Sequence, residues 1–267
     1  MNTKMEKILE DAFKFVESLG YNVWTVNLYG SQNYKMDTPQ SDYDFKALIF
    51  PSFEDVVSVT KPVSKVYTYG GGQVDVKDVR LMFGEYKKQN CQFLETLFTD
   101  FYWAAPEYRK EWEQVRTLAP LVARADISRH LNAICGMAME KIHALCHPYE
   151  SKVDLLREHG YDSKQLSHAY RLGYMMDKYM AGADYKSLLV PSEDELKVLM
   201  DLKLYRPQLS VEEAKAMGDA KVKEMHDKKV AYIAAHPDLA VNEETYAKLD
   251  AVKLGVLKKV FKAELLS

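Results

Sequence analysis

Residues 29–46, which read YGSQNYKMDTPQSDYDFK, decide the fold predicted for this chain. The apolar residues 23–28 predict a strand that ends at the turn Gly30-Ser31, and Asp42 and Asp44 lie where a second strand, over 43–50, begins. Two aspartates spaced two apart in a strand project from the same face, within reach of one cation. Gly30 permits close approach of the backbone, while Ser31 offers a hydroxyl and an amide to a triphosphate. The stretch therefore combines carboxylates for a divalent metal with a cradle for phosphate, the two parts that phosphoryl transfer needs.

An Asp-x-Asp pair alone is a weak signal, because surface strand ends carry such pairs by chance. Here the pair follows a strand, a Gly-Ser turn and a polar loop, and it precedes the apolar residues 47–50. This arrangement resembles the DNA polymerase beta-like nucleotidyltransferase superfamily. The motifs GSxxY at 30–34, DTP at 37–39 and SDxD at 41–44 are similar to one branch of it, the predicted nucleotidyltransferases associated with RNA repair.

The resemblance implies both a fold and a reaction. The fold is α+β, with a catalytic domain of a mixed sheet and flanking helices over residues 1–104, then an all-α domain over 105–267 that covers the active site. The reaction is transfer of NMP from an NTP, with ATP favoured, to a hydroxyl acceptor, with release of pyrophosphate. Two Mg²⁺ ions, or Mn²⁺ in their place, are the implied cofactors. Their implied ligands, which are also the catalytic residues, are Asp42, Asp44 and a third aspartate, and the motif positions implied to bind nucleotide are Gly30, Ser31, Tyr34 and Ser41.

The third aspartate is Asp75 or Asp78, both in a strand predicted over 73–79. With alternation, Val74, Val76 and Asp78 share one face, and Asp75 lies on the face opposite the valines, which are expected to pack inward. The resemblance also favours Asp75, because the family's third acid begins a segment that runs into a helix ending in Asn-x-x-x-Leu-Glu, as at residues 90–95 here. Asp78 is the alternative, and its structural role would be to cap a helix beginning near residue 79.

Hydrophobic periodicity divides the chain into an α/β half and a helical half. In the first half we predict a helix over 5–19, a short helix through residue 57 capped by Ser52, and a hairpin of strands 65–69 and 73–79 joined by three glycines. The helical half is predicted to hold helices over 106–125, 127–147, 163–180, 193–204, 211–236 and 242–266. Asp126 and Ser163 are the expected N-caps of two of them.

Lys164, His168 and Arg171 form one cationic stripe on the predicted helix 163–180, because they are spaced i, i+4 and i+7. Such a stripe is unusual for a core face, and a solvated face would normally include acids. The segment also resembles the YDxKxxxHxxRL stretch of the same branch. The resemblance implies that the three side chains bind the triphosphate or an acceptor phosphate, as a cationic wall opposite the aspartates. The alternative is a surface stripe, with Asp162 capping the helix.

Composition is that of an ordinary soluble protein. The 267 residues are 47% apolar and 28% charged with a net charge of -3, so any contact with nucleic acid must come from a local patch. The three cysteines, Cys91, Cys135 and Cys146, lack metal-ligand spacing and are expected to be buried and reduced. Residues 1–20 hold no apolar run long enough for a signal peptide or a membrane span. We expect a cytoplasmic protein without membrane contact; its oligomeric state is not predicted.

Two departures from the branch stand near the predicted site. Lys35-Met36 replaces the usual Gly-Leu, and Phe45-Lys46 follows the aspartate pair where a small residue is more usual. Neither changes a predicted metal ligand, so activity is expected. An RNA end, such as that of tRNA, is the acceptor we favour. A protein side chain or a small molecule, as in antitoxin-like and antibiotic-modifying relatives, is the second hypothesis, and a non-catalytic nucleotide- or RNA-binding protein is the third.

Overall fold

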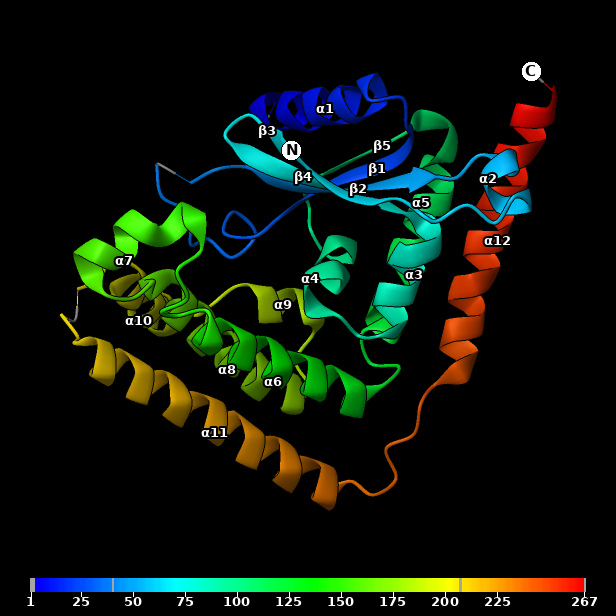
Figure 1. Ribbon diagram of the computed structural model, residues 1–267. Helices are drawn as coiled ribbons and strands as arrows, with labels where there is room; N and C mark the ends of the chain where they lie inside the picture. Colours follow the sequence, from blue (N-terminus) through cyan, green and yellow to red (C-terminus); the bar gives the residue numbers. More distant parts are fainter. Residues whose placement is uncertain (1–2, 40, 207, 267) are drawn as a thin grey trace. The chain divides into compact units, whose positions relative to one another are not determined.

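A computed structural model describes residues 3–39, 41–206 and 208–266 (Figure 1). The chain forms two compact units, of which the first comprises Met1–Asn33, Asp37–Asp126 and Val241–Ser267, and the second Tyr34–Met36 and Ile127–Ala240. The first unit contains a mixed five-stranded sheet with flanking helices, whereas the elements described in the second are all helices. The predicted α+β fold class, with a helical region following the sheet, is therefore confirmed.

The sheet of the first unit is built from the predicted apolar runs. Its strands are β1 (Asn22–Tyr29), β2 (Asp44–Phe50), β3 (Ser64–Tyr69), β4 (Gly72–Asp78) and β5 (Tyr102–Ala104), in the order β3-β4-β2-β1-β5. Neighbours are antiparallel except β2 and β4, which are parallel. The predicted hairpin forms between β3 and β4, and its glycines 70 and 71 take the positive φ angles of 57° and 89° that a tight turn requires.

Helices cover both faces of this sheet (Figure 1). Helix α1 (Thr3–Ser18) packs on β1, β2 and β5 with its buried apolar stripe, and α3 (Val79–Lys87) packs on β2 and β4. The remaining elements of the unit are α2 (Phe53–Val57), α4 (Cys91–Leu94), the 3₁₀ turns η1 (Glu95–Leu97) and η2 (Pro106–Tyr108), α5 (Arg109–Val122) and α12 (Glu243–Leu266). Ser52 caps α2 in a capping box with Asp55, as predicted.

The second unit is organised around α8 (Ser163–Met180), whose bounds match the prediction. It packs on α6 (Ile127–His143), α9 (Tyr185–Leu189), α10 (Glu193–Lys203) and α11 (Val211–Ala235). The shorter elements η3 (Glu150–Lys152) and α7 (Val153–His159) precede it. The N-cap of α8 is Asp162, whose side chain accepts from the Lys164 amide. The prediction that Ser163 is the cap was therefore wrong, and the alternative, in which Asp162 caps the helix, is confirmed on this point.

Several boundaries differ from the predictions. The units divide after residue 126 rather than at 105, because α12 packs on α5 and α3 and all three belong to the first unit. The short elements α4, β5, α7 and α9 offer too few periodic positions to be seen in the sequence. Cys91 and Cys135 are buried as expected, but Cys146 is exposed, since α6 ends at His143 and leaves it in the following turn. Within the described ranges no helix has the length and apolarity to span a membrane.

Candidate functional site

One face of the central sheet is polar although it is largely covered. Tyr29 pairs with Asp44 across β1 and β2, and Asn27 pairs with Lys46, which in turn pairs with Asp75 on β4. Residues paired in register project to the same side of a sheet, so all five share one face. Asn27 is 0% exposed and Lys46 is 3% exposed, in positions where apolar side chains are the rule. The opposite face is apolar and buried, which fixes the register: it carries Trp24, Val26 and Leu28 of β1, Phe45, Ala47 and Ile49 of β2, and Val74 and Val76 of β4.

Lys46 is the most unusual member of this face. Its Nζ lies 3.2 Å from Asp75 Oδ2, and it sits 4.1 Å from the centre of the Tyr29 ring and 4.3 Å from that of Phe93. Burial lowers the pKa of Lys46, while the negative charges of Asp75 and Glu95 act in the opposite direction. The site thus carries a buried cation held by one carboxylate and two aromatic faces. The sequence feature that indicates this buried cation is a single lysine within the otherwise apolar residues 45–50.

Gly30 forms the turn at the end of β1, and its amide is bonded to the buried side chain of Glu95. Its φ of +84° is favourable only for glycine, and its amide donates to Glu95 Oε1 at 3.1 Å. Glu95 is 2% exposed in η1, so an acid is buried here to hold the turn. Glu95 was not predicted as a site residue, although it ends the Asn-x-x-x-Leu-Glu stretch at residues 90–95 and is the one carboxylate within residues 93–98. Ser31 follows in the same turn and is partly exposed.

Asp42 and Asp44 do not share a strand, contrary to the expectation. Strand β2 begins at Asp44, and Asp42 is exposed ahead of it, beside the β3–β4 turn. Asp44 Oδ1 accepts from the amide of Gln73 at 3.2 Å, and its Oδ2 faces Gly30. Ser41 closes a local turn, with its Oγ accepting from the amide of Thr38 at 2.8 Å.

The three predicted carboxylates do not gather around one point where the implied magnesium ions could be shared. Carboxylate oxygens are the donors that Mg²⁺ prefers. However, across the described parts of the chain no three His, Cys, Asp or Glu side chains gather closely enough to hold a metal ion. Asp75 is bonded to Lys46, and Asp42 lies outside the strand. As placed, these residues do not fit a shared two-metal site, and the metal assignment of Asp42, Asp44 and Asp75 stays a prediction.

The second unit brings Arg171, one of the three predicted cations, and Lys203, which was not predicted, together with the segment Tyr34–Met36. The guanidinium of Arg171 stacks 3.7 Å from the centre of the Tyr34 ring, and Lys203 Nζ donates to the Met36 carbonyl at 2.5 Å. Arg171 is only 6% exposed, and its Nε and Nη1 have no hydrogen-bond partner among the residues described. Charged groups buried without partners are costly, so these two nitrogens are suited to an anion.

His168 and Lys164 lie on the same helix as Arg171, but in different surroundings. Burial, together with the positive charges of Arg171, Lys164, Lys141 and Lys203, holds the pKa of His168 well below its ordinary value. The ring is therefore neutral at pH 7, whereas Lys164 is exposed. The stripe therefore runs from the exposed Lys164 to the buried Arg171. It is neither the solvated surface stripe of the alternative nor an evenly exposed row of three cations.

Lys35, which stands where the resemblance led us to expect glycine, has an unusual backbone conformation. It takes a φ of +55°, in the left-handed region that favours glycine. Glycine would adopt this conformation freely, and lysine adopts it with strain.

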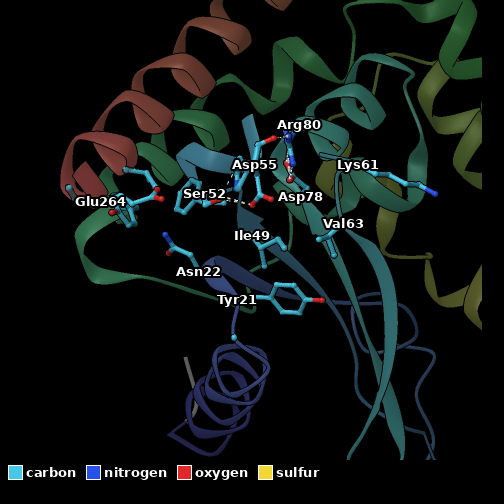
Figure 2. Close-up of a pocket in the computed structure, with 16 residues that line it drawn as sticks. Tyr21, Asn22, Ile49, Ser52, Asp55, Lys61, Val63, Asp78, Arg80 and Glu264 are labelled. Carbon is cyan, nitrogen blue, oxygen red and sulfur yellow. Dashed lines mark hydrogen bonds and ion pairs between the residues drawn. The ribbon is translucent and has the colours of Figure 1, made fainter. Parts of the chain in front are cut away.

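A separate cavity of about 600 Å³ lies at the opposite strand ends of the first unit, where β1 begins and β2 ends. Figure 2 shows Asp78 and Arg80 side by side on its wall, joined by an ion pair of 2.6 Å. Asp78 also caps α3 by accepting from the Arg80 amide at 2.7 Å, which is the structural role predicted for it. Asp55 belongs to the capping box of α2. These acids serve local structure.

No family model matches the sequence, and neither does any curated protein. Among solved structures, the chain is similar to the crystal structure of a nucleotidyltransferase-like protein from Exiguobacterium sibiricum 255-15, with 11% identity, coverage of 97% of this chain and 91% of that chain, and a TM-score of 0.34.

Proposed function

We propose that the chain is a nucleotidyltransferase that moves NMP from an NTP, with ATP favoured, to a hydroxyl acceptor. The observation that carries the proposal is the polar face of the central sheet, where Asp44 and Asp75 stand on adjacent strands next to the glycine turn at Gly30. Lys46 is buried between these two partly exposed acids at a cost in stability, which is typical of functional sites.

In the proposed reaction, a hydroxyl oxygen of the acceptor attacks the α-phosphorus of the NTP. The new bond joins that oxygen to the α-phosphorus, and the bond from the α-phosphorus to the bridging oxygen of the β-phosphate breaks. Pyrophosphate leaves with the bonding electron pair, and Asp75 takes the proton of the hydroxyl. The reaction needs no oxidant or reductant, and its atoms balance.

Magnesium enters this proposal with the substrate, as the counter-ion of the triphosphate. Asp42, which is exposed, and Asp44, which faces the Gly30 turn, are the carboxylates proposed to meet the Mg·NTP complex. The hydroxyl and amide of Ser31 are proposed to bind phosphate oxygens at the same turn. Because the Gly30 amide already donates to Glu95, it is not counted among these donors.

The cations of the second unit are proposed to bind a phosphate of one of the two substrates. Arg171 supports this role best, since its Nε and Nη1 are buried without hydrogen-bond partners among the described residues. Lys164 is exposed and supplies charge, whereas His168 is neutral at pH 7 and can donate or accept one hydrogen bond.

The acceptor favoured is an RNA end, and nucleotidylation of a protein or a small molecule is the second candidate. The net charge of -3 weighs slightly against a long RNA. The test is incubation with magnesium and each α-labelled NTP in turn, with tRNA, a generic RNA, cell-extract protein and a cell-extract small-molecule fraction as acceptors. Label that migrates with RNA supports the favoured acceptor. Label on protein or on a small molecule supports the second, and absence of transfer with every NTP refutes the enzyme.

A further inference from the structure

We propose that the ammonium of Lys46 is paired with Asp75 at the position where a metal ion would otherwise bind. In the protein without nucleotide, this pairing weakens the binding of divalent cations. The proposal concerns the protein without nucleotide, so it stands independently of the acceptor and of the transfer reaction.

One carboxylate and two aromatic rings surround the ammonium of Lys46 and fix its position. The side chain of Lys46 is 4% exposed and that of Asp75 is 15% exposed, so water does little to loosen their 3.2 Å contact. The rings of Tyr29 and Phe93, both less than 4.5 Å from Nζ, each present a π face to the charge. A cation–π contact is stronger when, as here, the cation is removed from water. Together these contacts hold the ammonium where a cation shared with Asp75 would lie.

The surrounding charge explains why a cation is buried here. Burial raises the pKa of Tyr29, and so do the nearby negative charges of Asp44, Asp75 and Glu95. The geometry agrees: Asp44 is paired with Tyr29 across β1 and β2, Asp75 is bonded to the ammonium that lies over the Tyr29 ring, and Glu95 accepts from the amide of the next residue, Gly30. Without a positive charge among them, their mutual repulsion would oppose the fold. Lys46 offsets this repulsion in the absence of any metal ion.

A divalent ion that binds Asp75 must displace this ammonium or share the carboxylate with it. Either event loses a charge-assisted contact, which is typically worth about 1.5–3 kcal/mol. Since 1.4 kcal/mol corresponds to a factor of about ten in affinity, removing the ammonium should tighten metal binding at least about tenfold.

Lys77 provides a matched control. It lies on β4 two residues from Asp75, on the same face of the sheet, and its Nζ is 4.9 Å from the same Phe93 ring. Its hydrogen bond goes to the hydroxyl of Ser64 at 2.8 Å rather than to a carboxylate. Replacing Lys77 removes an equal charge from the same neighbourhood without releasing Asp75.

The experiment is a titration with Mn²⁺ alone, followed by electron paramagnetic resonance of the free ion, on the full chain without nucleotide. Lys46→Met should bind Mn²⁺ at least tenfold more tightly than the wild type, Lys77→Met should bind as the wild type does, and Lys46→Met/Asp75→Asn should lose the gain. Lys46→Gln, which keeps a polar group at this site, replaces Lys46→Met if the latter does not fold. The proposal is overturned if the Lys46 variant binds no more tightly, if Lys77→Met gains as much, or if the double variant keeps the gain.

Discussion

Gly72→Ala should displace the start of β2 and with it both aspartates of the Asp-x-Asp pair. An added Cβ at Gly72 would lie 2.3 Å from the carbonyl oxygen of Tyr43 and 3.2 Å from Cβ of Asp42. Since ordinary van der Waals contact begins near 3.4 Å, the backbone at Tyr43 must move by about 1 Å. That carbonyl stands between Asp42 and Asp44, so both carboxylates move with it.

The cost follows from overpacking, which typically destabilises a protein by about 1–3 kcal/mol. For a chain of this size each kcal/mol lowers Tm by about 2–4 °C, so Gly72→Ala should lower Tm by about 2–12 °C and reduce NMP transfer. Gly84→Ala is the matched control, because it lies in α3 of the same unit with nothing within 4 Å of its added Cβ. It should raise Tm slightly, since alanine is favoured over glycine in helices. Thermal melts followed by circular dichroism, together with the label-transfer assay, measure both effects. A Gly72→Ala protein with wild-type Tm and wild-type transfer would refute the reasoning.

Three further changes test the second unit. The low pKa of His168 means that below about pH 6.5 the unfolded state gains a proton that the folded state resists, so stability falls as pH decreases. His168→Gln should reduce the difference in Tm between pH 5.5 and pH 7.5. A difference as large as that of the wild type would show that His168 is not its cause. Lys35→Gly should raise stability by roughly 0.5–1 kcal/mol, because relief of the left-handed strain exceeds the entropy cost of glycine, and a lower Tm would refute it. Arg171→Met should weaken binding of inorganic triphosphate about tenfold or more in calorimetry, and equal affinity would remove Arg171 from phosphate binding.

Local patterns predicted much of the fold. Alternation and apolar runs located β1, β2 and the β3–β4 hairpin, and helical periodicity gave the bounds of α8. The start of β2 was missed by one residue for a physical reason. The ladder with β1 ends at the pair Tyr29–Asp44, because Gly30 turns the chain away and leaves Asp42 without a partner on that side.

The contacts within the candidate site could not be read from the sequence. Alternation places Lys46 on the same face as Asp44, but its pairing with Asp75 depends on the parallel register of β2 and β4, which no local signal encodes. Glu95 likewise reaches the Gly30 amide from 65 residues away. The assignment of α12 to the first unit also rests on long-range contacts, such as the hydrogen bond of 2.9 Å from Gln89 Nε2 to the Tyr246 hydroxyl.

The most direct test of the proposed nucleotidyl transfer is the rate of label transfer by Asp44→Asn. Asparagine retains the Oδ1 that accepts from the Gln73 amide, so Tm should change little, while loss of the negative charge removes the carboxylate proposed to meet Mg·NTP. Transfer should fall at least about 100-fold, as expected for several kcal/mol of lost electrostatic stabilisation. Asp11→Asn, at an exposed aspartate of α1, should transfer at the wild-type rate. Wild-type transfer by a folded Asp44→Asn protein would contradict the account.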